Sequence, residues 1–139
     1  MFQKILLPVD VSDKHGPAIS VAAELAGASG GEVLLLHVIE VISGLPMEEE
    51  KAFYGRLEKA ARSHLEKLGA RFKQSKVRCR AEVTYGNRGP EVIRYARAAG
   101  ADLIVLTAPP IDPNNLASSW GSLSYKISLV SPLPVLLVK

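Results

Sequence analysis

Cysteine is almost absent from this chain of 139 residues, with Cys79 as the single example. One cysteine cannot form an internal disulfide, and it also excludes a zinc site built from several cysteines. The three histidines, His15, His37 and His64, do not have the H-x3-H or H-E-x-x-H spacing of a helical zinc site. The sequence therefore predicts neither a disulfide framework nor a metal centre.

Long hydrophobic runs are also missing. No apolar segment approaches the roughly 20 residues that a membrane-spanning helix needs. The apolar start at residues 5–7 is interrupted by Pro8 and Asp10, which does not fit a signal peptide. The chain is 47% hydrophobic and 22% charged, which is ordinary for a soluble globular domain. We therefore expect one domain over residues 1–139, located in the cytoplasm and without a membrane partner.

The charge is only mildly basic, with a net charge of +3. Nucleic-acid binding usually needs lysine and arginine gathered on one face. Lys76, Arg78 and Arg80 form a short basic row, but they alternate with apolar residues over 77–84. That period of two indicates a half-exposed strand at a sheet edge, where charge discourages the addition of other strands. A solvated edge is the favoured interpretation of this row, and a nucleic-acid partner is not expected.

Apolar segments alternate with helical patterns along the whole chain. Strands are expected at residues 2–9, 33–39, 77–84, 103–106 and 133–138. Helices are expected to follow the first four strands, and the longest covers 48–74. Continuous apolar runs suit strands that are covered on both faces. Five strands alternating with four helices predict one α/β domain with a mostly parallel sheet.

Several residues mark the expected helix ends. Ser12 or Asp13 is predicted to cap the first helix, with Pro17 in its first turn. Pro90 is predicted at the first position of the third helix, and Gly100 at its end. The apolar face expected for the long second helix comprises Phe53, Leu57, Ala60, Ala61, Leu65, Leu68 and Phe72. Cys79 falls on the apolar face of its strand, where an inert buried thiol is favoured over a nucleophile.

Four segments together resemble the universal stress protein family over essentially the full chain. They are residues 5–12 (ILLPVDVS), residues 34–38 (LLLHV), the Gly86 turn with residues 91–93 and 100–105, and residues 121–124 with 131–138. The resemblance implies a three-layer, doubly wound sheet of five parallel strands in the order 3-2-1-4-5, of the adenine nucleotide alpha hydrolase type. The edges would be residues 77–84 and 133–138. The resemblance also implies a homodimer that pairs the last strand, residues 133–138, with its twofold mate.

Nucleotide-binding members of that family carry the pattern G-x2-G-x9-G-S/T after the fourth strand. Glycines there let backbone N–H groups approach phosphates closely. In this chain Thr107 and Pro110 stand where the first two glycines are expected, and only Gly121-Ser122 remains. The prolines at 109, 110 and 113 also remove three amide donors. The altered loop argues against ATP binding in the usual family mode.

The resemblance still implies a nucleotide position at the carboxyl ends of strands one and four. Asp10 matches the aspartate on the ribose or adenine side, and Val38 matches a residue that contacts the base. Asp10 has an equally plausible role as a structural cap at the end of its strand. The candidate nucleotide residues are Pro8, Val9, Asp10, Val38, Thr107, Ala108, Gly121, Ser122, Leu123 and Ser124.

Alternatives remain for the polar residues around this loop. Ser122 and Ser124 suit phosphate oxygens, yet Ser118, Ser119 and Ser122 are also ordinary helix caps, and the cap is the favoured interpretation. Trp120 can stack on a base, but packing over the core or an interface is more usual. Arg88 can reach a phosphate, while a solvated surface arginine is favoured.

These observations favour a regulatory or binding module of the stress response, rather than an efficient enzyme. It would act with an unidentified protein partner and without ATP bound in the usual mode. The alternative is a protein that binds ATP or AMP, with magnesium, and at most hydrolyses ATP slowly. No serine or cysteine has a recognisable base partner in the sequence, and no other nucleotide-binding glycine motif is present.

Overall fold

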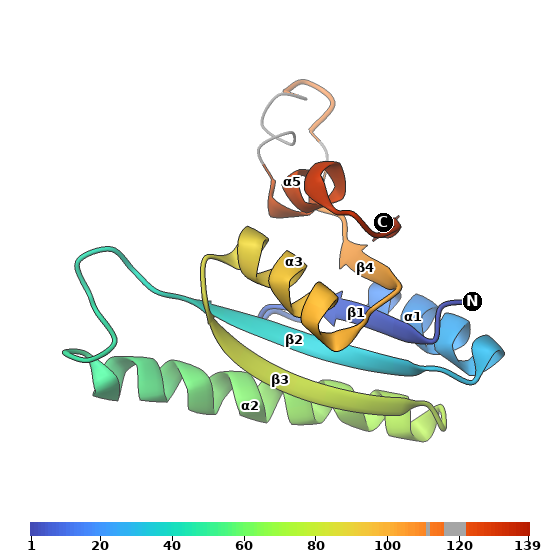
Figure 1. Cartoon of the computed structure of the whole chain (residues 1–139), viewed down its shortest axis with the longest axis horizontal. Helices are drawn as coiled ribbons and strands as arrows, with labels where there is room; N and C mark the ends of the chain where they lie inside the picture. Colours follow the sequence, from blue (N-terminus) through green and yellow to red (C-terminus); the bar gives the residue numbers. More distant parts are fainter. Residues whose placement is uncertain (111, 116–121) are drawn as a thin grey trace.

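The computed structural model describes residues 1–110, 112–115 and 122–139. Five parallel strands form one sheet in the order β3-β2-β1-β4-β5, which confirms the predicted order (Figure 1). The strands are β1 (Lys4–Pro8), β2 (Glu32–Glu40), β3 (Arg78–Gly86), β4 (Leu103–Thr107) and β5 (Val135–Val138). The central strand β1 therefore lies between β2 and β4.

Helices cover both faces of the sheet and complete three layers. They are α1 (Gly16–Ser29), α2 (Lys51–Gln74), α3 (Arg88–Ala99) and α5 (Leu123–Val130). Ile5 and Leu7 of β1 pack with the buried residues of α1 and α2, whereas Leu6 packs with those of α3 and α5. Both faces of β1 are buried because successive side chains point to opposite faces, and this explains the continuous apolar run.

The start of α1 differs from the prediction. Ser12 does not cap the helix, and neither does Asp13, because α1 begins at Gly16 with His15 in the cap position and no side-chain cap hydrogen bond. Ser12 instead donates its N–H to the Asp10 carboxylate at 2.9 Å and its hydroxyl to the same oxygen. Pro17 lies in the first turn, as predicted. Ser12 therefore forms a local turn with Asp10 instead of capping the helix.

The buried face of α2 is only partly the predicted one. Ala61, Leu65 and Phe72 are buried, but Leu57 and Ala60 are exposed, and the helix starts at Lys51 rather than at residue 48. Tyr54, which was not predicted on this face, is fully buried there. Its hydroxyl accepts the Ile42 N–H at 3.0 Å and donates to the Leu45 carbonyl, so burial leaves its polar atom satisfied.

The β3 edge agrees with the interpretation of the basic row. Arg78 donates to the Gly30 carbonyl, and Arg80 pairs with Glu32 at 3.2 Å, so both arginines lie along the exposed edge. The alternation over 77–84 also predicts Ala81 on the apolar face, but Ala81 is exposed. Burial raises the pKa of the Cys79 thiol to about 11, which agrees with an unreactive cysteine.

Two further boundaries shift slightly. Pro90 is the third residue of α3 rather than the first, because the helix begins at Arg88 after Asn87. The last strand starts at Val135, so the preceding Leu133 lies outside it. Within the part of the chain that the structure describes, no helix is long and apolar enough to cross a membrane.

Gly31 provides a direct test of the packing between β1 and β2. A Cβ added to Gly31 would lie 2.6 Å from the Gln3 carbonyl oxygen, which forces the backbone to move. We expect Gly31→Ala to lower the free energy of unfolding by about 1–3 kcal/mol. Gly55→Ala is the matched control, because Gly55 lies in exposed α2 with nothing within 4 Å of the added Cβ.

Gly55→Ala should raise stability by up to about 1 kcal/mol, since alanine is the better helix former. Urea denaturation measures both variants. Equal stabilities for the two would contradict the close approach at Gly31.

Candidate functional site

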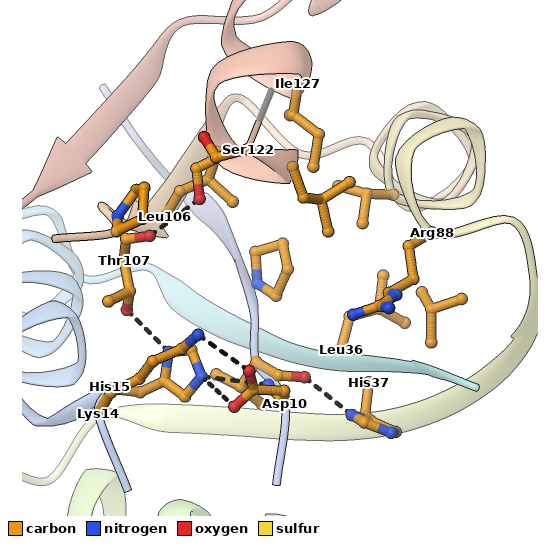
Figure 2. Close-up of a pocket in the computed structure, with 17 residues that line it drawn as sticks. Asp10, Lys14, His15, Leu36, His37, Arg88, Leu106, Thr107, Ser122 and Ile127 are labelled. Carbon is orange, nitrogen blue, oxygen red and sulfur yellow. Dashed lines mark hydrogen bonds and ion pairs between the residues drawn. The ribbon is translucent and has the colours of Figure 1, made fainter. Parts of the chain in front are cut away.

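A pocket of about 240 Å³ opens at the carboxyl ends of β1 and β4 (Figure 2). Its apolar lining comes mainly from β2, β4, α3 and α5. These side chains are Leu36, Val38, Val92, Leu106, Leu123 and Ile127. The polar lining consists of Asp10, Lys14, His15, His37, Arg88 and Thr107, with serines at the start of α5. An apolar pocket with a few convergent polar groups has the character of a small-molecule site.

The structure gathers most of the predicted site residues here. Eight of the candidates line the pocket, namely Pro8, Val9, Asp10, Val38, Thr107, Ser122, Leu123 and Ser124. Ala108 is not among the lining residues, and Gly121 and Trp120 lie outside the described residues. Binding of a nucleotide by these residues stays a prediction.

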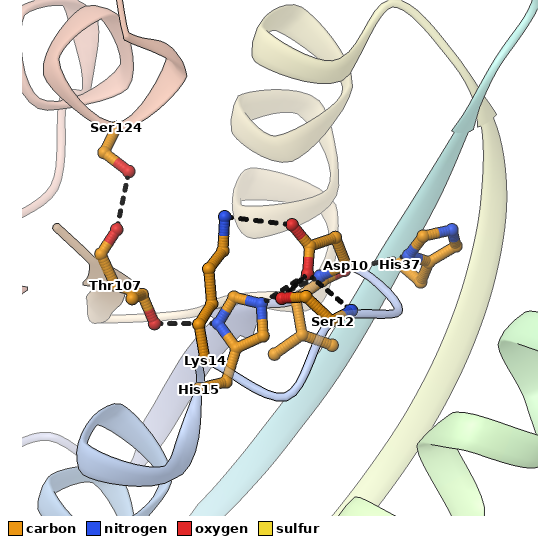
Figure 3. Close-up of polar contacts among 8 residues, drawn as sticks. Asp10, Ser12, Lys14, His15, His37, Thr107 and Ser124 are labelled. Carbon is orange, nitrogen blue, oxygen red and sulfur yellow. Dashed lines mark hydrogen bonds and ion pairs between the residues drawn. The ribbon is translucent and has the colours of Figure 1, made fainter. Parts of the chain in front are cut away.

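Asp10 is the carboxylate of the pocket (Figure 3). Its Oδ1 accepts the Ser12 N–H and hydroxyl, and its Oδ2 lies 3.1 Å from Lys14 Nζ. Partial burial acts to raise the Asp10 pKa, but the hydrogen bonds from Ser12, His15 and Lys14 together lower it well below its usual range. The carboxylate therefore stays ionised at neutral pH, and its side chain is 40% exposed.

His15 joins Asp10 to the opposite wall of the pocket, and sequence reasoning missed it. His15 Nδ1 lies 2.7 Å from Thr107 Oγ1, although the two residues are 92 positions apart. His15 Nε2 lies 2.9 Å from Asp10 Oδ1 and also accepts the Asp10 backbone N–H at 3.1 Å. The residue is only 5% exposed. Burial lowers the His15 pKa, and the neighbouring Asp10 only partly opposes this.

The order Thr107, His15, Asp10 superficially matches a nucleophile, a base and an orienting carboxylate. The backbone contact argues against that role. The contact of Nε2 with the Asp10 N–H places the proton of a neutral ring on Nδ1, where it is donated to the Thr107 hydroxyl oxygen, whereas the contact with Asp10 Oδ1 places that proton on Nε2. Only a ring with its proton on Nε2 can take the proton of the Thr107 hydroxyl. The geometry shows a hydrogen-bonded link between two strand ends.

Arg88 and His37 line the side of the pocket opposite Thr107 and Ser122 (Figure 2). Arg88 pairs with Glu40 at 3.1 Å and is half-exposed, which agrees with a surface arginine. It also lines the pocket. His37 donates Nδ1–H to the Val9 carbonyl at 2.9 Å, which leaves its Nε2 unprotonated in the neutral ring. The Arg88 guanidinium and the His37 imidazole thus share this wall of the pocket.

The profile of the universal stress protein family matches residues 1–139. The chain belongs to that family. A universal stress protein of Thermus aquaticus is 32% identical over the whole of both chains. The solved structure of the hypothetical protein MJ0577 is 26% identical, with a TM-score of 0.83 over 100% of this chain and 96% of its own. A universal stress protein of Archaeoglobus fulgidus, solved in complex with dAMP, has the same fold at 19% identity, with a TM-score of 0.75 over 99% and 98% of the two chains.

In this universal stress protein, the amides that follow β4 are already used or missing. The Ala108 N–H donates to the Val138 carbonyl at 2.8 Å, which ties the loop to β5. Pro109 and Pro110 have no N–H to give. These three positions therefore offer no backbone donor to a phosphate in the described conformation.

The serine hydroxyls at the start of α5 also have protein partners. Ser122 Oγ accepts the Tyr125 N–H at 3.2 Å, and this confirms the helix-cap interpretation of Ser122. Ser124 Oγ donates to the Thr107 carbonyl at 2.9 Å. Both serines line the pocket, yet the Ser122 hydrogen bond caps α5 and the Ser124 hydrogen bond holds α5 against β4.

The cap predicts a measurable loss of stability. Ser122→Ala should lower the free energy of unfolding by about 1 kcal/mol, because the Tyr125 N–H loses its acceptor at the first turn of α5. Ser128→Ala is the control on the same helix, since that exposed hydroxyl only donates to the Tyr125 carbonyl within the helix. Chemical denaturation measures both variants, and a Ser122 variant as stable as its control would contradict the cap.

Proposed function

We propose that this protein is a regulatory binding module whose pocket takes an adenine nucleoside or nucleoside monophosphate, not ATP held by a phosphate-binding glycine loop. The observation that carries the proposal is an asymmetry between the two pocket walls. On the β1 side, the Asp10 carboxylate is ionised and partly exposed. On the β4 side, residues 108–110 offer no free backbone donor.

The β1 wall suits the ribose end of such a ligand. A carboxylate has about four acceptor positions, two on each oxygen. Oδ1 of Asp10 already receives both Ser12 donors, whereas Oδ2 is paired with Lys14. Oδ2 therefore retains acceptor capacity for hydroxyl groups. The apolar lining around Leu36 and Val38 provides a surface against which a flat base can pack.

The cations at the pocket favour a small anion over a triphosphate. Lys14 is paired with Asp10, and Arg88 is paired with Glu40, so each cation is already partly neutralised. A triphosphate would add several negative charges without the amides that usually receive them. The dAMP complex of the Archaeoglobus fulgidus relative supports the monophosphate class. Among the residues that the structure describes, no group of three His, Cys, Asp or Glu side chains is placed to hold a metal ion.

Isothermal titration calorimetry with adenosine, AMP and ATP, each with and without magnesium, tests this proposal. We expect AMP and ATP to bind within about threefold of each other, because extra phosphates gain no charge-assisted hydrogen bonds. Asp10→Asn should weaken AMP binding by about tenfold or more, since hydrogen bonds to a charged group contribute about 1.5–3 kcal/mol. Asp13→Asn, exposed in the same loop and outside the pocket lining, is the control.

Two results would count against the proposal. If magnesium-ATP bound more than tenfold tighter than AMP, the loop would be holding phosphates after all. If none of the three ligands bound to the folded protein, the pocket would not be an adenine nucleotide site. Either result leaves the assignment to the family unchanged.

A second proposal concerns self-association through β5. Within the described sheet β5 pairs with β4 on one side, and its other edge carries no strand. Exposed apolar side chains lie on β5 and on the preceding α5, with Leu136 38%, Leu129 68% and Val130 69% exposed. An apolar edge without charge invites pairing with another strand, and the twofold mate is the occupant we propose.

Leu136→Glu should shift the protein from dimer to monomer, because it places a charge on the exposed side of the edge strand. Light scattering after size exclusion measures the mass. Leu57→Glu is the matched control, since Leu57 is equally 38% exposed but lies on α2. Val135 and Leu137 are less suitable sites, because both pack against the core beneath α3 and α5. A soluble dimer of the Leu136 variant would place the interface elsewhere.

A further inference from the structure

His15 makes three polar contacts that one imidazole ring cannot satisfy at the same time. Nδ1 faces Thr107 Oγ1 at 2.7 Å. Nε2 faces two groups of Asp10, the backbone N–H at 3.1 Å and the carboxylate oxygen Oδ1 at 2.9 Å. The first of these is a donor and the second is an acceptor, so Nε2 suits only one of them in each protonation state. All of these contacts appear together in Figure 3.

A neutral ring with its proton on Nε2 would donate to Asp10 Oδ1, but only a neutral ring with its proton on Nδ1 lets Nε2 accept the Asp10 N–H while Nδ1–H donates to Thr107. The Nε2 lone pair then faces Asp10 Oδ1 without a proton between them. In the protonated ring, Nε2–H donates to Oδ1 with a charge-assisted bond. The Asp10 N–H then loses its acceptor. The proton of His15 thus decides which part of Asp10 the ring holds.

We propose that neutral His15 carries its proton on Nδ1 and is a positioning residue, whose protonation sets whether the Asp10 carboxylate keeps its charge for a hydroxyl-bearing ligand or is neutralised by the ring at Oδ1. The neutral ring anchors the Asp10 backbone and leaves the carboxylate to the pocket. The imidazolium binds Oδ1 and neutralises the carboxylate charge, which weakens Oδ2 as an acceptor for the hydroxyl groups of the ligand. This inference deepens the proposed function and rests on it for the identity of the ligand. Its structural half, the link between His15 protonation and Asp10, stands without any ligand.

The surroundings of His15 set the direction of the effect. Asp10 and Lys14 face the ring from its own loop, Thr107 faces it from β4, and His64 acts on it from α2. Burial, Lys14 and His64 all favour the neutral ring, whereas Asp10 alone favours the charged one. The His15 pKa lies below its ordinary value as a result. The pocket is therefore in its ligand-accepting state at neutral pH and leaves it on acidification.

The pH dependence of stability has a definite sign. Because the folded state lowers the His15 pKa, the unfolded chain binds the proton more readily. The stabilisation from neutral His15 is present above the unfolded pKa of about 6.5 and is lost as pH falls from there to the lowered folded value. Ligand binding through Asp10 follows the same direction, and by reciprocity a bound ligand lowers the His15 pKa further.

Adenosine is the best probe, because the phosphate of AMP itself titrates near pH 6. The Kd for adenosine should rise between pH 7.5 and pH 5.5, by up to about tenfold per unit below the His15 pKa. His15→Gln provides an amide oxygen as acceptor for the Asp10 N–H and cannot be protonated. Its Kd for adenosine should be the same at pH 7.5 and pH 5.5, at whatever level the loss of the ring sets. His64→Gln, which removes a histidine outside the pocket lining, should retain the pH dependence.

Nuclear magnetic resonance gives a readout that does not depend on a ligand. The Asp10 amide signal should shift with the same midpoint as the His15 ring, and this shift should be absent in His15→Gln. An Asp10 amide that ignores the His15 titration would overturn the inference, as would an equal pH dependence of adenosine binding in the glutamine variant. Failure of adenosine to bind at pH 7.5, with the linked titration present, would overturn the proposed ligand and keep the role of His15.

Discussion

The position of β1 between β2 and β4 is the constraint on which the rest of the molecule depends. β1 leads to β2 on one side and β4 leads to β5 on the other, so right-handed crossovers place the helices that follow them on opposite faces of the sheet. The loop after β1 leads to α1, and the chain after β4 leads to α5, on opposite faces. Loops that diverge in this way open a crevice at the carboxyl ends of the strands. The pocket follows from the strand order before any side chain is chosen.

A crevice between two strand ends needs something to hold its walls at a fixed separation. His15 fills that role from a buried position, with one nitrogen on each wall. On the other side, the Ser124 hydroxyl holds α5 to the end of β4. Neutral and charged hydrogen bonds are stronger in such a sheltered place than in water, and an unpaired group there is costly. The polar groups that shape the pocket are thus also the ones a ligand must share.

Much of the fold was predictable because its signals are local or repeat along the chain. Continuous apolar runs marked β1, β2 and β4, and Gly30 and Gly100 ended their helices in the left-handed conformation. Other features depend on partners distant in sequence. The residues around His15 in the sequence do not predict its contact with Thr107. Those around Ala108 do not predict that its N–H donates to the Val138 carbonyl. Such pairings are fixed by strand register, which the sequence pattern does not contain.

Local rules also competed with one another. Ser12 fits a helix cap and an aspartate turn equally well, and the turn at Asp10 prevailed. The sequence pattern did not predict that Tyr54 is buried, because a tyrosine hydroxyl is buried only where it has hydrogen-bond partners. Those partners, at Ile42 and Leu45, are known only from the structure. Around the pocket, the residues contributed by strand ends could be predicted from family position. Their hydrogen-bond partners required coordinates.

The prolines after β4 have a consequence beyond the donors they remove. Each one fixes its own φ and restricts the residue before it, so the unfolded and unliganded chain has fewer conformations to lose. The Asp112 side chain adds a further local restraint by accepting the Asn114 N–H at 2.9 Å. A glycine loop gains its shape from the phosphate that it encloses, and that ordering reduces the affinity it can deliver. At residues 109, 110 and 113 the restraint is covalent, so the chain there needs no bound anion to define its path.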